Sequence, residues 1–358
     1  MGQIVASAAK SILLLFLVTL FSFSSPAANA QSSSATPGLA QKVIFDTDFA
    51  SPPQDDATAL IFALRSPELK ILGVTTVAGN ATVQRATADA LRVLEIAGRT
   101  DIPVYRGFNR PWLHEKSEFA TKVHGKWWSD EAPPTPPGGF AKRKEESESA
   151  VSFLVRAVEE NPNEITIIAI GPLTNVATAI RQESGFAKKV KKIVIMGGAI
   201  AKLPDGGGNV TPNAEFNFWV DPEAAQVVIR SGIPIVLTPL NVTSKTDFSK
   251  AAYEKIIAVD TPVTRLLKET MGPWVAKHPD MHAQMYDQLT VASLVDPSLV
   301  KAKDLFVDVD ITHGPDYGTS LGAEKIWEGG EGAAKISVQY DVDADRFTQM
   351  FVDRITAK

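Results

Sequence analysis

Four aspartates lie close together near the start of the chain, at Asp46, Asp48, Asp55 and Asp56. Carboxylates gathered at one place repel one another unless protons or a cation offset their charge. Their oxygen ligands suit a hard cation, calcium or magnesium, rather than zinc, and calcium tolerates the looser geometry of a loop. Aspartates also favour the start of a helix without any metal, so helix capping is a second interpretation of Asp55 and Asp56.

Other polar residues follow the hydrophobic runs at 71–77, 165–170 and 192–196, or precede a helical segment at 289–294. These residues are Asn80, Thr174, Asn175, Asn209, Glu215, Asn217 and Asp287. In an open parallel sheet, a ligand binds outside the carboxyl ends of the strands. If the runs are strands of one sheet, the polar residues and the four aspartates are predicted to meet at that edge.

The elements that must position these residues alternate between strands and helices. Short runs rich in β-branched and aromatic residues predict strands at 43–45, 71–77, 103–105, 165–170, 192–196 and 235–237. This order predicts an α/β fold, in which helices cover both faces of a mostly parallel central sheet. Alternating residues at 306–311 and 336–338 predict a small antiparallel appendage near the C-terminus, followed by a closing helix.

The composition is that of an ordinary soluble globular protein, with 358 residues, 44% of them hydrophobic and 22% charged, and a net charge of −5. No basic run is long enough to predict a nucleic-acid partner. The chain has no cysteine, which excludes disulfides, thiolate catalysis and zinc–thiolate sites.

The first 30 residues are predicted to be an export signal, because Lys10 precedes the apolar run 12–21 and Ala28-Asn29-Ala30 offers a cleavage site. Residues 31–41 are expected to form a flexible leader, and residues 42–358 a single domain. The apolar run is short for a membrane span. We therefore expect a periplasmic or secreted protein without a stable membrane anchor; an uncleaved anchor is the alternative interpretation.

Several ordered motifs resemble those of the inosine-uridine nucleoside hydrolases, from about Lys42 to the C-terminus. The motifs are Asp46-Thr47-Asp48, Asp55-Asp56-Ala57, Val77-Ala78-Gly79-Asn80, Gly171-Pro172-Leu173-Thr174-Asn175, Met196-Gly197-Gly198, the segment 208–217 and Asp221-Pro222-Glu223-Ala224-Ala225. A single Asp-x-Asp would be a weak signal, but this order of motifs is specific. The resemblance implies a Rossmann-like nucleoside hydrolase fold and a homo-oligomer, either a dimer or a tetramer.

The resemblance also implies roles for individual residues. Calcium would be bound by Asp48, Asp56, the main-chain carbonyl of Thr174 and Asp287, with the ribose diol and a water completing the ligands. Asp48 would act as the general base for that water. The ribose hydroxyls would be held by Asp55, Asn80, Asn209, Glu215, Asn217 and Asp287.

These residue types suit the cleavage of a ribose N-glycosidic bond. Positive charge builds on the sugar in the transition state while negative charge builds on the leaving base, and a dense oxygen shell favours that cationic sugar. A site that binds every hydroxyl rejects a sugar that lacks one, because buried polar partners are then left unsatisfied. The expected substrates are therefore ribonucleosides rather than deoxyribonucleosides.

Two features depart from the family pattern. The link between Asp48 and Asp55 has six residues where the family has a short Pro-Gly link, and we expect it to bulge outward. Tyr286 stands where many members carry a histidine thought to polarise the leaving base. Tyrosine is a weaker acid, so His124, and less so His278 and His282, are further candidates for the acid. Trp274 and Trp219 are candidates for stacking on the base, although an aromatic residue in a helical stretch more often belongs to the core.

Two other functions fit part of the sequence. A phosphatase of the haloacid-dehalogenase type also places Asp-x-Asp after a first hydrophobic strand, but it gives no reason for Asn209, Glu215 and Asn217. An exported ribose- or nucleoside-binding protein would keep the sugar shell and lack leaving-group activation. Turnover of p-nitrophenyl riboside, whose leaving group needs no protonation, separates a hydrolase from a binding protein.

Overall fold

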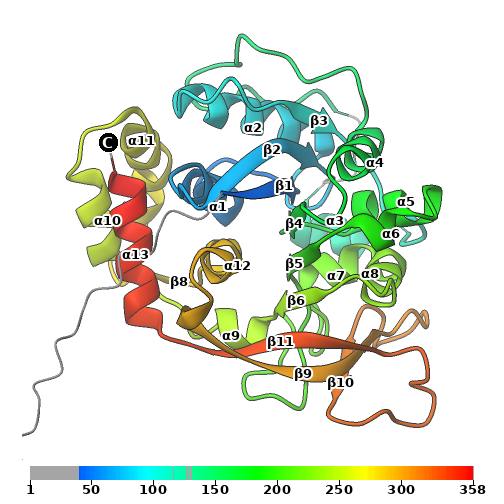
Figure 1. Ribbon diagram of the computed structural model, residues 1–358. Helices are drawn as coiled ribbons and strands as arrows, with labels where there is room; N and C mark the ends of the chain where they lie inside the picture. The colour runs from blue at the N-terminus through cyan, green and yellow to red at the C-terminus, as the bar shows by residue number, and fades with distance from the viewer. Residues whose placement is uncertain (1–39, 116, 126–128, 130, 358) are drawn as a thin grey trace, which may run out of the picture. The chain divides into compact units, whose positions relative to one another are not determined.

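The computed structural model describes residues 40–357, except for 116, 126–128 and 130 (Figure 1). The predicted export signal and all but the last two residues of the leader lie outside the described residues. Among the described helices, none combines the length and the apolar character that a membrane crossing requires.

Nine strands form one sheet in the order β10-β9-β11-β6-β5-β4-β1-β2-β3. Its strands are β1 (Gln41–Thr47), β2 (Leu69–Thr76), β3 (Val104–Arg106), β4 (Thr166–Ala169), β5 (Lys192–Met196), β6 (Ile235–Thr238), β9 (Val300–Val309), β10 (Ser320–Ala323) and β11 (Ala334–Val342). The strands from β3 to β6 pair in parallel, as the alternation of strands and helices predicts. A separate two-stranded sheet joins β7 (Phe248–Ser249) and β8 (His282–Ala283).

Helices cover both faces of the sheet (Figure 1). One face packs against α1 (Asp55–Leu64), α2 (Val83–Ile96), α9 (Leu240–Thr243), α10 (Lys250–Ile257), α11 (Pro262–Lys277), α12 (Tyr286–Val295) and α13 (Ala344–Thr356). The other packs against α4 (Ala150–Glu160), α5 (Thr174–Gln182), α6 (Phe186–Lys189), α7 (Phe216–Val220) and α8 (Pro222–Ile229). Because strand side chains alternate between faces, Val43 and Phe45 belong to the first core and Ile44 to the second.

The predicted antiparallel strands near the C-terminus are confirmed, and they continue the central sheet. β9 pairs antiparallel with both β10 and β11. β11 in turn pairs in parallel with β6, where Ser337 lies opposite Val236. α13 follows, as the expected closing helix.

The link between Asp48 and Asp55 is packed inward over most of its length, which corrects the expectation that it bulges outward. Phe49 is fully buried and Ala50 is 1% exposed. The amide of Ser51 donates a hydrogen bond of 3.0 Å to Asp89 Oδ2 on α2. Only Pro53 and Gln54 are exposed. Burial of the apolar Phe49 side chain in the core is favourable in free energy compared with its exposure to solvent in an outward loop.

The described residues of the segment 107–146 form one helix, α3 (Glu118–His124), and are otherwise irregular. It is attached to the domain by polar contacts. The amide of Trp112 donates to Asp221 Oδ2 at 3.1 Å, and its indole Nε1 donates to Thr178 Oγ1 at 3.1 Å. His114 Nδ1 lies 2.7 Å from the carbonyl oxygen of Trp219.

Candidate active site

A pocket of about 220 Å³ opens at the carboxyl edge of the sheet, beside the starts of α1 and α12. It is lined by Gln54, Asp55, Asn80, Ile170, Met196, Asn209, Val210, Glu215, Phe216, Asn217, Tyr286 and Asp287. Seven predicted site residues are therefore brought together there: Asp55, Asn80, Asn209, Glu215, Asn217, Tyr286 and Asp287. No lysine or arginine is among these lining residues of the described chain.

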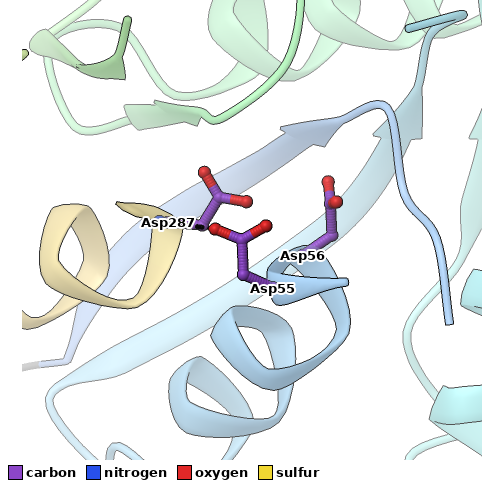
Figure 2. Close-up of side chains that lie close together, drawn as sticks. All are labelled: Asp55, Asp56 and Asp287. Carbon is purple, nitrogen blue, oxygen red and sulfur yellow. Dashed lines mark hydrogen bonds between the residues drawn. The ribbon is translucent and has the colours of Figure 1, made fainter. Parts of the chain in front are cut away.

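Three aspartates lie close together at the site (Figure 2). Asp55 and Asp56 project from the first turn of α1, and Asp287 projects from the first turn of α12. Carboxylate oxygens of the three lie within 4.8 Å of one another. The amide of Asp287 donates to Asp55 Oδ2 at 3.3 Å, which ties the two helix starts together.

Asp56 is fully buried and held from two sides. Thr47 Oγ1 donates to Asp56 Oδ1 at 2.6 Å, and Asn80 Nδ2 donates to Asp56 Oδ2 at 3.1 Å. Burial, together with the neighbouring charge of Asp55, raises the pKa of Asp56 to about 7. Asn80 both lines the pocket and contacts Asp56, so Asp56 lies directly behind the pocket wall.

Asp48 is also fully buried, and two glycines enclose it. The amide of Asn80 donates to Asp48 Oδ2 at 2.5 Å. A Cβ on Gly79 would lie 2.1 Å from Asp48 Oδ2, and one on Gly171 would lie 2.7 Å from the Asp48 amide nitrogen. Any side chain at either glycine would therefore displace Asp48. Asp48 Oδ1 is buried without a hydrogen-bond partner among the described residues.

No lysine or arginine of the described chain lines this pocket to offset the charge of its carboxylates. Burial and the charge of Asp56 raise the pKa of Asp48 well above its usual range. Burial and the charges of Asp55 and Asp56 do the same for the pKa of Asp287. Protons or a divalent cation must compensate these groups. An unpartnered buried oxygen within an all-oxygen donor set fits a hard cation.

Three further side chains form the opposite wall. Glu215 is the N-cap of α7 and accepts hydrogen bonds from the amides of Gly198, Asn217 and Phe218. Burial nevertheless raises the pKa of Glu215 to about 7. Asn217 Nδ2 donates to the carbonyl oxygens of Ile170 and Met196, each at 3.2 Å. Asn209 Oδ1 accepts from the Phe216 amide at 2.9 Å.

The structure does not bring Thr174 to this cluster. Thr174 Oγ1 donates to Asp221 Oδ2 at 2.6 Å, and the Thr174 carbonyl accepts from Thr178 Oγ1 at 2.7 Å inside α5. Thr174 is not among the lining residues. Ile170 is, and its amide donates to the Asp46 carbonyl at 2.9 Å, which places Ile170 at the end of β1. The Thr174 carbonyl stays a prediction as a ligand, and the Ile170 carbonyl is a second candidate because Ile170 lines the pocket.

Tyr286 lines the pocket, and its hydroxyl lies 3.4 Å from Gln284 Oε1. Burial and the charge of Asp55 raise the pKa of Tyr286, so it is a poorer acid than a free tyrosine. His282 is exposed and contacts Asp247 at 2.9 Å, while His278 contacts the Trp274 carbonyl at 2.8 Å. Neither histidine lines the pocket.

His124 ends α3, but its side chain lies outside the described residues. Trp219 is 8% exposed and belongs to a small core cluster, which agrees with the core interpretation. Trp274 lines a second pocket of about 250 Å³, which shares Gln54 and Asp55 with the first.

Sequence reasoning missed Ile170, Gln54, Met196, Val210 and Phe216, all of which line the pocket. Ile170 follows the last residue of β4, and a carbonyl at a strand's carboxyl end faces the ligand edge. The place of Ile170 at the end of a predicted strand was therefore a signal that could have identified it. Gln54 lies in the link that has no counterpart in the family pattern, so no motif marked it.

Residues 43–349 match the family described as inosine-uridine preferring nucleoside hydrolase. Uridine nucleosidase 1 of Arabidopsis thaliana is 38% identical over 317 residues, which cover 86% of this chain and 91% of that protein. The pyrimidine-specific ribonucleoside hydrolase RihA of Salmonella typhimurium is 34% identical over 322 residues, covering 88% and 99%.

Two solved structures agree with the fold. A plant nucleoside hydrolase has a TM-score of 0.76 and 34% identity, covering 89% of this chain and 99% of its own. The purine-preferring ribonucleoside hydrolase of Gardnerella vaginalis has a TM-score of 0.75 and 28% identity, covering 88% and 98%. With the acidic pocket at the sheet edge, these similarities establish that the chain belongs to the inosine-uridine preferring nucleoside hydrolase family and is an enzyme that hydrolyses ribonucleosides.

Proposed function

We propose that the protein is a calcium-dependent hydrolase that cleaves ribonucleosides to ribose and a free nucleobase, with Asp48 as the general base. The observation that carries this proposal is Asp48 Oδ1, a buried carboxylate oxygen without a hydrogen-bond partner among the described residues, which interacts with Asp56 of the acidic cluster. A structural carboxylate would have both oxygens satisfied.

The residues that would hold the ion are Asp48, Asp56, Asp287 and a carbonyl, that of Thr174 or that of Ile170. All four ligands are oxygens, which suits a hard cation such as calcium better than zinc. When bound, the ion would supply positive charge that keeps these carboxylates ionised, and it would bind the diol of the ribose. Asn80 fixes the relative position of two of these carboxylates, because its backbone amide donates to Asp48 and its side-chain amide donates to Asp56.

Asp48 accepts a proton from the attacking water while the oxygen of that water forms a bond to C1′ of the ribose. The N-glycosidic bond breaks at the same time, and its electron pair leaves with the base nitrogen. The side chains of Asp55, Asn80, Asn209, Glu215 and Asn217 face the pocket and would bind the ribose hydroxyls. Their oxygens surround the sugar as its ring becomes cationic, so they stabilise the transition state more than the neutral substrate.

The leaving base needs a hydrogen-bond donor or a proton. Tyr286 is the candidate in the pocket, and its raised pKa suits a hydrogen-bond donor better than an acid. His124 stays a prediction as the acid. Uridine is the first substrate to test, since two relatives are named for uridine or pyrimidine ribonucleosides.

We also propose export to the periplasm or the medium, and assembly into a dimer or a tetramer. Export rests on the sequence pattern of the first 30 residues. Assembly rests on the family resemblance.

The test is hydrolysis of uridine, cytidine, inosine, adenosine and p-nitrophenyl riboside by enzyme treated with a chelator and then supplied with calcium, magnesium or zinc. We expect turnover to be lost on chelation and restored best by calcium. We also expect 2′-deoxyuridine to be disfavoured against uridine by on the order of 10⁴-fold in kcat/KM. Full activity in the chelator would refute the metal proposal, and tight nucleoside binding without release of base would indicate a binding protein.

A further inference from the structure

The link 49–54 forms a fixed platform beside the active site. Phe49 is fully buried in the core, and the Ser51 amide is held by Asp89 Oδ2 at 3.0 Å. Asp89 is itself 2% exposed and lies 3.5 Å from Arg85 Nε. The Gln54 amide then donates to the Ser51 carbonyl at 3.4 Å, which closes a turn directly before Asp55. The backbone of Gln54 is thus anchored to both α1 and α2.

The side chain of Gln54 has no hydrogen-bond partner among the described residues. Gln54 occupies the N-cap position of α1, yet it makes no side-chain capping bond. Thr82 and Ser149, at the N-caps of α2 and α4, each accept a backbone amide. No other hydrogen bond engages the Gln54 side chain within the described part of the chain. Gln54 is exposed and lines both the active-site pocket and the neighbouring pocket.

The lining residues divide into two groups by chemistry. Carboxylates and amides gather around Asp287 and Glu215, where the sugar would bind. The remaining lining residues offer two aromatic rings, aliphatic and thioether groups and one amide: Gln54, Ile170, Met196, Val210, Phe216 and Tyr286. Rings and aliphatic groups suit the flat faces of a nucleobase, and an amide suits its polar edge.

We infer that Gln54 is a specificity-determining residue whose side-chain amide hydrogen-bonds the polar edge of the leaving nucleobase; this inference rests on the proposed function. A primary amide has both a donor and an acceptor. Uracil and hypoxanthine each present an N–H next to a C=O, so both can form a paired contact with it. The ring of p-nitrophenyl riboside has no such pair.

The test compares Gln54→Met with wild type on uridine, inosine and p-nitrophenyl riboside. Methionine keeps the length of the side chain and removes its hydrogen bonds. For the better of the two nucleosides, we expect the ratio of its kcat/KM to that for p-nitrophenyl riboside to fall about five- to tenfold. Because both values come from one preparation, the ratio does not depend on how much of the variant is folded.

Gln349→Met is the matched control. Gln349 is exposed on α13 and donates to Asp353, so the same substitution there removes one surface hydrogen bond. Its ratio is expected to stay within about twofold of wild type. An active wild type whose ratio is unchanged by Gln54→Met would overturn this inference alone. A wild type that cleaves neither nucleosides nor p-nitrophenyl riboside would overturn the proposed function, and the inference with it.

Discussion

Asp46 and Asp48 lie two residues apart and are both buried, but their surroundings differ. Both oxygens of Asp46 accept from Asn175 Nδ2 at 3.2 Å, and the same amide also donates to the Thr76 carbonyl. Asp48 has one oxygen bound by the Asn80 amide and one without a partner among the described residues. Asp46 is thus satisfied by a neutral amide, whereas Asp48 needs a further ligand. The comparison separates a structural carboxylate from a candidate catalytic one within one motif.

Replacing each aspartate by asparagine gives the largest expected effect. Asp48→Asn removes the proposed base and a proposed metal ligand, so kcat/KM for uridine should fall by at least about 10³-fold while the far-ultraviolet circular dichroism is retained. Asp46→Asn is the matched control, because it makes the same chemical change at a residue whose hydrogen-bond partner, Asn175, is still present. It should lower kcat/KM less than about tenfold. Equal losses in the two variants would contradict the distinction.

Removing the partner of Asp46 should affect stability. Asn175→Ala leaves a buried carboxylate without its donor and also frees the Phe108 amide, which donates to Asn175 Oδ1. We expect the free energy of unfolding in urea to fall by about 2–4 kcal/mol. Adding Asp46→Asn removes the stranded charge and should restore part of that loss. A loss below about 1 kcal/mol for the single variant would show that Asp46 does not depend on Asn175.

Tyr286→Phe tests whether Tyr286 supplies a proton to the leaving base. If Tyr286 only donates a hydrogen bond, kcat/KM for uridine should fall less than about tenfold, as expected for one hydrogen bond. A fall beyond about 10²-fold, absent with p-nitrophenyl riboside, would instead identify Tyr286 as the general acid. Tyr286→His extends the series, and we expect it to raise activity on inosine.

The smallest expected effect is a pH dependence of stability in chelator. Burial raises the pKa of Glu215 to about 7 and that of Asp221 to about 6, above the values of an unfolded chain. The folded state then holds protons that the unfolded state has lost, so stability must fall as pH rises through these values. The melting temperature should be higher near about pH 5 than near about pH 8. Glu215→Gln should flatten this pH dependence. An unchanged slope of melting temperature against pH would contradict the contribution of Glu215.

The order of strands and helices could be predicted because apolar runs and motifs mark the strand ends locally. Asp55 and Asp56 were predicted at a helix start, and α1 begins at Asp55. Their meeting with Asp287 was predicted from the family resemblance, since Asp287 follows no strand of the predicted parallel sheet. The antiparallel pairing of β9 and β11 was also visible as alternation.

Features set by tertiary packing could not be predicted. Which residues line a pocket depends on how strand ends and helices pack together, which is why Ile170 and not Thr174 is a lining residue. Whether a loop bulges depends on space in the core, and the core had room for Phe49. The sequence positions of His278 and His282, shortly before Tyr286, gave no sign that the Trp274 carbonyl and Asp247 would hold them outside the pocket.

The contact between Asp55 and Asp287 joins residues 232 positions apart in the chain. β1, which leads into Asp48, lies inside the sheet between β2 and β4, so its neighbours are also made later in synthesis. Contacts of such long range form slowly, because the chain between them must first be ordered. A nascent chain that ends before α12 therefore contains most of the sheet but no complete catalytic centre. Recovery of turnover during refolding would consequently report the last stage of assembly, after the secondary structure has returned.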